Sequence, residues 1–229
     1  FDYVMVTAGL QLMLWGAFKK IVVADRIAPF VDRVYDAPHE FSGVSLVFST
    51  WLYAFQLYFD FSGYTDIALG AAMIFGIKLL PNFNRPYFAV SIQDFWKRWH
   101  MSLTSWLNDY IYTPFMRSRF TGLKMYNLIL LGMMLTFVVS GFWHGANWTF
   151  IVWGALHGFY IVVSLLAQKR WNKFAKNTGL NKRKKAYRAL KISVTFFLVC
   201  FSYIFFRASS IGDAGFIIVH SFTGWGDLI

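Results

Sequence analysis

Ser140-Gly141-Phe142-Trp143-His144-Gly145-Ala146-Asn147-Trp148 places an ionisable histidine between two long apolar segments. Residues 125–143 carry no formal charge, and neither do residues 145–168. A polar side chain at membrane depth is costly and is by default a functional hypothesis. The two glycines that flank the histidine allow a second backbone, or a substrate, to approach the imidazole. Two interpretations of His144 are open: a reactive group, or a hydrogen bond across a helix interface.

The composition of the chain is that of a membrane protein. Of the 229 residues, 57% are hydrophobic and 14% are charged, which lies outside the usual range of a soluble domain. Several uncharged segments approach the ~20 residues that a helix needs to cross the hydrocarbon core. They do not alternate apolar and polar residues, as a membrane barrel would. We therefore predict an all-α, polytopic transmembrane helical bundle with re-entrant or amphipathic helices.

Apolar segments predict membrane spans, or parts of spans, at residues 4–18, 43–59, 125–143, 145–168 and 192–206. The first is short, so we expect it to be tilted, interfacial or incomplete. Residues 21–40 mix charges with Pro29 and Pro38, and they predict a helix end followed by a loop at the membrane surface. The chain is thus expected to cross the membrane several times.

Residues 92–112 predict one amphipathic helix that is not long enough to span. A capping box at residues 91–94 begins it, because a serine oxygen and an aspartate carboxylate can satisfy early backbone N–H groups. His100 shares a face of this helix with Trp96 and Leu103. His100 is therefore either a satisfied core histidine or a functional group inside the membrane.

The net charge of +11 is concentrated in two places. Ten of the 22 basic residues lie within residues 169–191, without an acidic residue among them, and a smaller basic group lies at residues 117–124. In a membrane protein such segments mark cytoplasmic loops. Since they flank the spans on either side of His144, the histidine is expected at a turn between those spans, in mid-membrane or toward the far side. Orientation explains the charge, so no nucleic acid is expected as a partner.

Two carboxylates, Asp60 and Asp66, interrupt the apolar sequence at residues 60–66, DFSGYTD. Six residues is a poor spacing for two side chains on one helix face, which argues against an acid/base pair. They are expected instead to cap a helix break or to pair with Lys or Arg from elsewhere.

The other candidate groups have structural interpretations. Cys200 lies in an apolar segment and reads as a small buried hydrophobe. His157 shares a helical face with Trp153 and is expected to be structural or to support the site. The sequence contains no P-loop, dinucleotide fingerprint, HExxH or GxSxG motif. We predict no metal site and no bound cofactor.

Five sequence segments together resemble the membrane-bound O-acyltransferase superfamily, and among its branches the bacterial alginate O-acetylation branch. They are NFNRPY at residues 82–87, DFWKRWHMSL at residues 94–103, SGFWHGANW at residues 140–148, WGALHG at residues 153–158 and DFSGYTD at residues 60–66. Members of that superfamily are longer, so we expect residues 1–229 to be part of a single membrane-embedded O-acyltransferase domain.

The resemblance implies that His144 is the catalytic histidine and His100 the second polar position of the site. Histidine suits general-base catalysis because its pKa lies near neutrality. We expect His144 to act on a hydroxyl and His100 to hydrogen-bond the donor carbonyl or steady the intermediate. An apolar passage would be lined by Trp99, Trp143 and Trp148. Asn147 would either orient the imidazole or cap a helix.

The resemblance also implies the substrates and the setting. The acyl donor is expected to be a cytoplasmic thioester such as acetyl-CoA, a substrate rather than a cofactor. The acceptor would be a hydroxyl of an extracytoplasmic polysaccharide, often reached through an accessory acyltransferase on the periplasmic or outer face. The protein would be a multi-pass protein in contact with lipid in the cytoplasmic (inner) membrane of a bacterium.

Three alternatives stay open. Within the superfamily, the D-alanyl transferase of teichoic acid modification carries a similar Trp-His pair. Outside it, a transporter or channel could use the histidines as a proton relay. A scaffold subunit could carry the same helices without chemistry.

Overall fold

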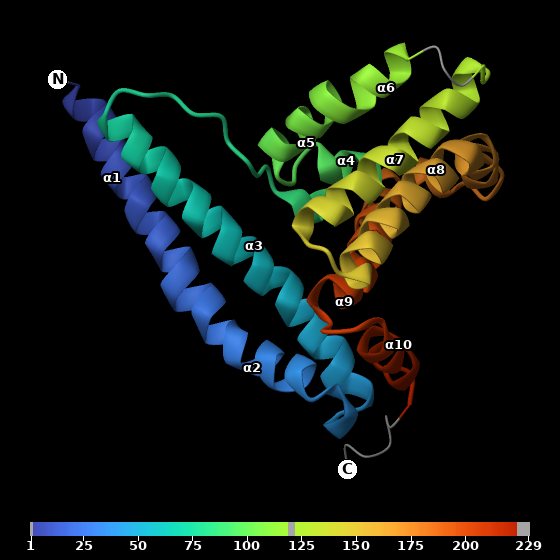
Figure 1. Ribbon diagram of the computed structural model, residues 1–229, viewed down its shortest axis with the longest axis horizontal. Coiled ribbons are helices and arrows are strands. Elements are labelled where there is room, and N and C mark those ends of the chain that lie inside the picture. The colour runs from blue at the N-terminus through green and yellow to red at the C-terminus, as the bar shows by residue number, and fades with distance from the viewer. Residues whose placement is uncertain (1, 119–121, 224–229) are drawn as a thin grey trace. The chain divides into compact units, whose positions relative to one another are not determined.

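The computed structural model describes residues 2–118 and 122–223, and Figure 1 shows their helices. Every regular element in the described residues is helical, which confirms the all-α fold class. The chain divides into two compact units, one of residues 1–83 with 207–229 and one of residues 84–206. Each is described by itself below, and the single domain over residues 1–229 stays a prediction.

Two long helical stretches that pack side by side form the first unit (Figure 1). One consists of α1 (Tyr3–Ala17), a π-helical segment η1 (Phe18–Ala24) and α2 (Asp25–Asp36). The other is α3 (Gly43–Ile74). A short 3-10 turn, η2 (Pro38–Glu40), connects them, and a shorter helix near the C-terminus, α10 (Ile211–His220), completes the unit.

Ion pairs between α1–η1 and α3 explain why neither helix ends where the sequence predicts. Lys19 Nζ lies 2.5 Å from Asp66 Oδ2, and Lys20 Nζ lies 2.6 Å from Asp60 Oδ1. Lys19 also donates to Ser62 Oγ at 3.1 Å. Because each charge has a partner on the neighbouring helix, the backbone continues through both sites. The predicted helix break at residues 60–66 and the predicted helix end near residue 21 are wrong, whereas the pairing of the carboxylates with lysines is confirmed.

The second unit consists of short helices followed by long ones. The long helices are α7 (Met125–His144), α8 (Trp148–Asn177) and α9 (Lys184–Arg207). α7 and α8 pack side by side as an antiparallel hairpin (Figure 1). The short elements that precede them are η3 (Pro86–Phe88), α4 (Ile92–Trp96), α5 (Met101–Leu107), η4 (Asn108–Tyr112) and α6 (Thr113–Arg117).

The α7–α8 hairpin depends on glycines at its closest approach. A Cβ added at Gly154 would collide with the backbone oxygen of Phe137 and would lie 3.1 Å from the backbone of Gly141. A Cβ at Gly141 would collide with the backbone oxygen of Phe150. Small residues let two helix backbones come this close inside a membrane. The close approach of a second backbone that the sequence predicts beside His144 is confirmed at Gly141.

The basic segment at residues 169–191 is not a long loop. It consists of the end of α8 and the start of α9, joined by a short 3-10 turn, η5 (Leu180–Lys182). Lys and Arg are good helix formers, so both helices continue past their apolar parts. Trp171 Nε1 donates to Tyr187 Oη at 2.9 Å and ties the two helical ends together. Residues 119–121 of the other basic segment lie outside the described residues.

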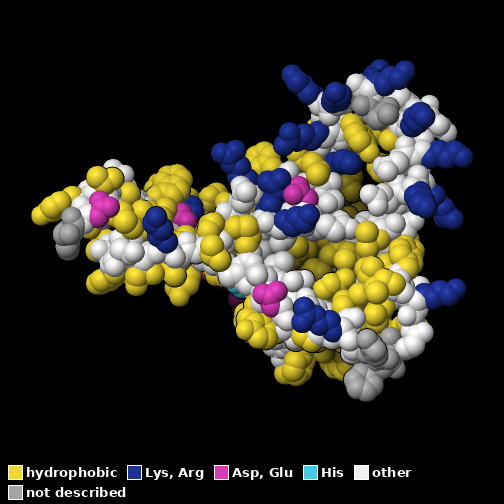
Figure 2. All heavy atoms as spheres, turned by 90° about the horizontal axis from the view of Figure 1, so that it is seen from above, with side chains coloured by type: hydrophobic (Ala, Val, Ile, Leu, Met, Phe, Trp, Pro, Cys, Tyr) yellow, Lys and Arg dark blue, Asp and Glu magenta, His cyan; other side chains and the backbone are white. Residues whose placement is uncertain are grey.

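The described helices have the length and hydropathy of a multi-pass membrane protein. Four stretches within the described residues satisfy both criteria: Tyr3–Asp36 and the helices α7, α8 and α9. α3 is not among the four, so the span at residues 43–59 stays a prediction. In Figure 2 hydrophobic side chains cover much of the visible surface, while the Lys and Arg side chains gather toward one part of it. Large exposed apolar surfaces of this kind are expected where helices face lipid.

Candidate active site

His144 is the last residue of α7, and α8 begins four residues later at Trp148. The turn that the sequence predicts at this point is confirmed. Asn147 caps α8, because its Oδ1 accepts the backbone N–H of Thr149 at 3.1 Å. Asn147 therefore makes the cap contact that was one of its two interpretations.

Aromatic rings surround the half-buried imidazole of His144. The ring centroids of Trp143, Trp153 and Phe206 lie 4.9, 5.0 and 4.9 Å from it, all edge to face. Phe150 adds a fourth ring at 6.2 Å. In the part of the chain that the structure describes, neither ring nitrogen of His144 has a hydrogen-bond partner. The surrounding aromatic rings therefore hold the imidazole by packing alone, and its two nitrogens are available to bind another molecule.

His100 sits at a break in the chain rather than within a helix. α4 ends at Trp96 and α5 begins at Met101, so the continuous helix predicted over residues 92–112 is wrong. His100 adopts the left-handed conformation, with φ +43°, which is uncommon and strained for a residue other than glycine. Such outliers cluster at functional sites because the surrounding structure must hold them in place.

Asp94 holds this break together. Its Oδ2 accepts the backbone N–H of Val90 at 3.0 Å, and its Oδ1 accepts Arg98 Nε at 2.8 Å. Ser91 Oγ accepts the Asp94 N–H at 3.1 Å, so the predicted capping box forms, with the carboxylate on Val90. Burial raises the pKa of Asp94, but the hydrogen bonds from Arg98 and Val90 outweigh it and leave that pKa below its usual value. The carboxylate is thus ionised and fully used in fixing the backbone ahead of His100.

A second backbone outlier lies next to the same break. Arg85 has φ +47° although it precedes Pro86, and residues before proline normally adopt extended conformations. The neighbouring Asn84 N–H donates to the Arg98 carbonyl at 2.9 Å. The segments at residues 82–87 and 94–103, which carry the family resemblance, are therefore joined by a direct backbone hydrogen bond.

Trp143 brings the two candidate catalytic histidines together. Its ring centroid lies 6.4 Å from that of His100 and 4.9 Å from that of His144. Burial lowers the pKa of His100 to about 4, so this imidazole is neutral at pH 7. A neutral pair of imidazoles can accept a proton at one ring and offer a hydrogen bond from the other.

The three tryptophans expected to line a passage lie in different surroundings. Trp143 is 55% exposed beside both histidines, and Trp148 is 72% exposed. Trp99 is buried against Phe95 and Tyr203, with ring centroids 5.5 and 6.1 Å apart. Substrate binding by these three residues and by Asn147 stays a prediction, as do the catalytic roles of the two histidines.

Three ring neighbours of His144 were not predicted as site residues: Phe150, Trp153 and Phe206. Trp153 belongs to the segment WGALHG, where the sequence analysis placed it only as a companion of His157. Phe206 lies in the apolar sequence of α9, and no local feature of the sequence distinguishes it from the other phenylalanines there. Only the packing of α9 on the hairpin reveals its position.

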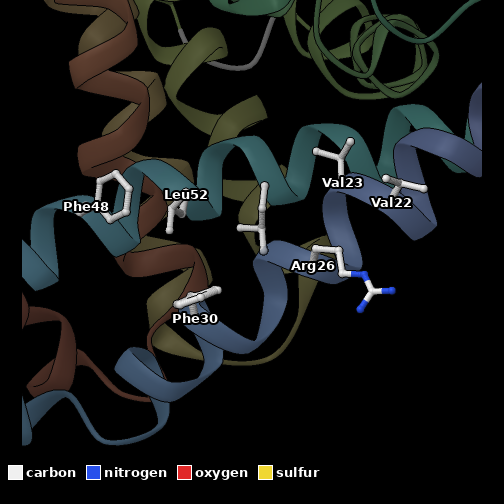
Figure 3. A pocket seen from close by; sticks show the side chains of 7 residues that line it. Val22, Val23, Arg26, Phe30, Phe48 and Leu52 are labelled. Carbon is white, nitrogen blue, oxygen red and sulfur yellow. The ribbon is translucent and has the colours of Figure 1, made fainter.

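No group of three potential metal ligands forms among the described residues. A shallow apolar groove of about 370 Å³ occurs in the first unit, where Arg26 stands at its edge (Figure 3). It contains no histidine and is not part of the candidate site. Its lining residues are Val22, Val23, Arg26, Ile27, Phe30, Phe48 and Leu52.

Comparisons with known proteins agree with these features. The Peptidoglycan O-acetyltransferase of Helicobacter pylori is 39% identical over 213 residues, which are 93% of this chain and 38% of that protein. The Probable alginate O-acetylase AlgI of Azotobacter vinelandii is 35% identical over 223 residues, 95% of this chain and 41% of that protein. The Teichoic acid D-alanyltransferase of Bacillus subtilis is 36% identical over 158 residues, 67% of this chain and 39% of that protein.

This chain thus spans about two fifths of the length of the curated relatives it matches. Residues 3–210 match the family described as MBOAT, membrane-bound O-acyltransferase family. The match covers both units, the break that carries His100 and the turn that carries His144. The chain belongs to the membrane-bound O-acyltransferase family.

Proposed function

We propose that the protein moves an acyl group, in the first place acetyl, from a thioester donor such as acetyl-CoA toward a hydroxyl of an extracytoplasmic polysaccharide. The observation that carries the proposal is the imidazole of His144, held by aromatic rings while both nitrogens lack a partner in the described residues. The names of the peptidoglycan and alginate relatives support the acetyl group and the polysaccharide acceptor.

In the proposed reaction His144 is the general base. Its neutral ring accepts the proton of the acceptor hydroxyl while the hydroxyl oxygen attacks the carbonyl carbon of the thioester. The tetrahedral intermediate then keeps the new C–O bond and loses the C–S bond. The imidazolium returns its proton to the departing thiolate, so the products are an ester and a free thiol. A positioned base of this kind contributes ~10²–10⁴-fold in rate.

The remaining site residues support this step. His100 is neutral at pH 7 and would donate a hydrogen bond to the carbonyl oxygen as negative charge develops on it. Trp143 neighbours both imidazoles and, with Trp99 and Trp148, would line the apolar approach that excludes water. Exclusion of water matters because a thioester that reaches the base without an acceptor would be hydrolysed.

The basic ends of α8 and α9 suggest how the protein is oriented. Lys and Arg at helix ends favour the cytoplasmic side, which is also the side of an acetyl-CoA donor. Such a cluster also attracts anionic lipid headgroups. We place the protein in the cytoplasmic (inner) membrane of a bacterium, where a partner acyltransferase on the outer face would deliver the group to the polymer.

A D-alanyl donor is the second candidate, because the teichoic acid D-alanyltransferases are also relatives of this chain. The acyl group that the donor supplies, acetyl or D-alanyl, distinguishes the two candidate functions. Mass spectrometry of surface polymers from a strain that lacks the gene would find missing acetyl esters in one case and missing D-alanyl esters in the other.

The function is tested by His144→Ala in the full-length protein. We expect O-acylation to fall by ~10²–10⁴-fold while the membrane level of the protein stays normal. His39→Ala is the matched control, because His39 lies in the first unit with its side chain 63% exposed. Unchanged acylation in the His144 variant would discard the catalytic role, and transport of a substrate without an acyl donor would favour a transporter instead.

A further inference from the structure

We infer that His157 is a positioning residue that sets the distance between His100 and His144, and that it does so as a neutral ring with its proton on Nε2. This inference rests on the proposed function for its catalytic consequence, but the bonding pattern behind it stands on geometry alone. His157 lies on α8 and is fully buried, with none of its surface exposed.

Both ring nitrogens of His157 are used. Trp96 Nε1 lies 3.2 Å from His157 Nδ1, and Ser202 Oγ lies 2.9 Å from His157 Nε2. Ser202 Oγ also lies 2.7 Å from the Val199 carbonyl oxygen. The three side chains belong to α4, α8 and α9, so one imidazole joins three helices of the second unit.

Counting donors and acceptors selects one tautomer. An indole N–H can only donate, so His157 Nδ1 must be the acceptor and carries no proton. A carbonyl can only accept, so the Ser202 hydroxyl donates its proton to Val199. Ser202 Oγ is then free to accept, and His157 Nε2–H donates to it. Every donor has an acceptor in this arrangement, and no second proton can be placed on Nδ1 without losing the bond from Trp96.

The chain of contacts leads from His157 to both candidate catalytic residues. The Trp96 ring packs edge to face on Trp153 at 5.8 Å between centroids, and Trp153 packs on His144 at 5.0 Å. Trp96 is also the last residue of α4, directly before the break that carries His100. The imidazole of His157 thus fixes the ring beneath His144 and the helix that leads into His100.

His157 differs from His144 in what its nitrogens can do. The lone pair on His157 Nδ1 is occupied, whereas neither nitrogen of His144 has a partner in the described residues. The facing side chains of α4 are Phe95 and Trp96, and that of α7 is Phe137; none of them carries a charge. Tyr160 is a titratable neighbour on α8. His157 therefore holds the site and takes up no proton during the reaction.

Three substitutions in the full-length protein separate positioning from proton transfer. Asn keeps an acceptor near the place of Nδ1, and Gln keeps a donor near the place of Nε2, but neither side chain can act as a base. We expect His157→Asn and His157→Gln to retain kcat within about tenfold, with the pH profile of the wild type. His157→Leu removes both hydrogen bonds and should lower kcat by about 10²-fold, as a displacement of about 1 Å can, with little change in KM. A loss in the Asn and Gln variants as large as that of His144→Gln would overturn the inference.

A second measurement does not depend on activity. Nitrogen NMR of ¹⁵N-histidine-labelled full-length protein in lipid discs should assign His157 as the Nε2–H tautomer at pH 7. The Trp96→Phe variant should weaken that preference, because it removes the donor to Nδ1. An Nδ1–H tautomer or an imidazolium in the wild type would overturn the inference even if acyl transfer is observed. Absence of acyl transfer in the wild type would instead overturn the proposed function, and the NMR result would still decide the tautomer.

Discussion

The α1–α3 pair and the α7–α8 hairpin differ in how each accommodates polar side chains between closely packed apolar helices. Both bring two helices into close contact through glycines, and both place polar side chains among apolar ones. In the α1–α3 pair, Lys19 and Asp66 are ionised partners 2.5 Å apart. At the end of the hairpin, His144 has aromatic neighbours and no hydrogen-bond partner in the described residues.

This difference separates structural from reactive polar groups. A buried charge whose partner is fixed has no capacity left for a ligand, and it serves the packing of two helices. An imidazole that is neutral and unpaired is costly to the fold and retains its capacity to exchange a proton. The comparison therefore predicts loss of stability from changes in the α1–α3 pair and loss of activity from changes at the hairpin turn.

The largest expected effect on stability follows from breaking the ion pair. Lys19→Met leaves the Asp66 carboxylate, whose side chain is 20% exposed, without its partner, and should lower the free energy of unfolding by ~3–5 kcal/mol. The double variant Lys19→Met/Asp66→Leu should recover most of that loss, because a well-packed apolar pair replaces both charges. Thermal unfolding in detergent would measure both. Equal destabilisation in the single and double variants would show that the charge pair itself is needed.

A methyl group at the closest point of the hairpin should have the next largest effect. Gly154→Ala forces the new Cβ against the Phe137 carbonyl and the backbone of Gly141, and overpacking of this kind costs ~1–3 kcal/mol. It should also lower acylation, because the hairpin positions His144. Gly215→Ala on α10 is the matched control, since nothing lies within 4 Å of the added Cβ. Equal stability of the two variants would contradict the close approach of α7 and α8.

The sequence predicted the hairpin well because its signals are local. An uncharged segment on each side, a histidine and an asparagine suited to helix capping determine where α7 ends and α8 begins. The family resemblance added the candidate roles of His144 and His100. The ring neighbours Phe150, Trp153 and Phe206 were missed as members of the site, because aromatic residues are frequent in every apolar segment of this chain and their contacts depend on tertiary packing.

The sequence failed where a distant partner overrides a local rule. Asp60 and Asp66 left two alternatives open, a helix break or pairing with Lys or Arg from elsewhere, because two carboxylates in an apolar helix are costly. Lys19 and Lys20, 40 or more residues earlier in the chain, supply the pairing, and the helix continues. Conversely, residues 92–112 have the periodicity of one helix, yet the chain breaks at His100. The Asp94 bonds to Val90 and Arg98 and the Asn84 bond to Arg98 hold that break, and periodicity cannot reveal them.

A smaller effect, dependent on pH, is expected at His100. Its pKa is about 4 in the folded protein and ~6.5 in an unfolded chain. Between these values the unfolded state binds more protons, so the free energy of unfolding should fall as the pH is lowered from 7 toward 4. His100→Gln removes this contribution, and its melting temperature should fall less between pH 7 and pH 5 than that of the wild type. Parallel curves would contradict the burial of a neutral imidazole at the break.

The smallest effect should come from Trp148, which is more exposed than Trp143. Trp148 is 72% exposed, and no ring contact joins it to either histidine in the described residues. Because so exposed a ring can contribute only a small part of the lining of the apolar approach, Trp148→Ala should change kcat/KM by less than about threefold. Trp143→Ala removes the ring that neighbours both His100 and His144, and a loss of about tenfold, or ~1.4 kcal/mol, is expected. Measurement of acyl transfer with both variants at equal membrane levels ranks the two residues. A larger loss at Trp148 would place the substrate passage on the exposed side of the turn, and the rings packed around His144 would then serve only to hold the imidazole.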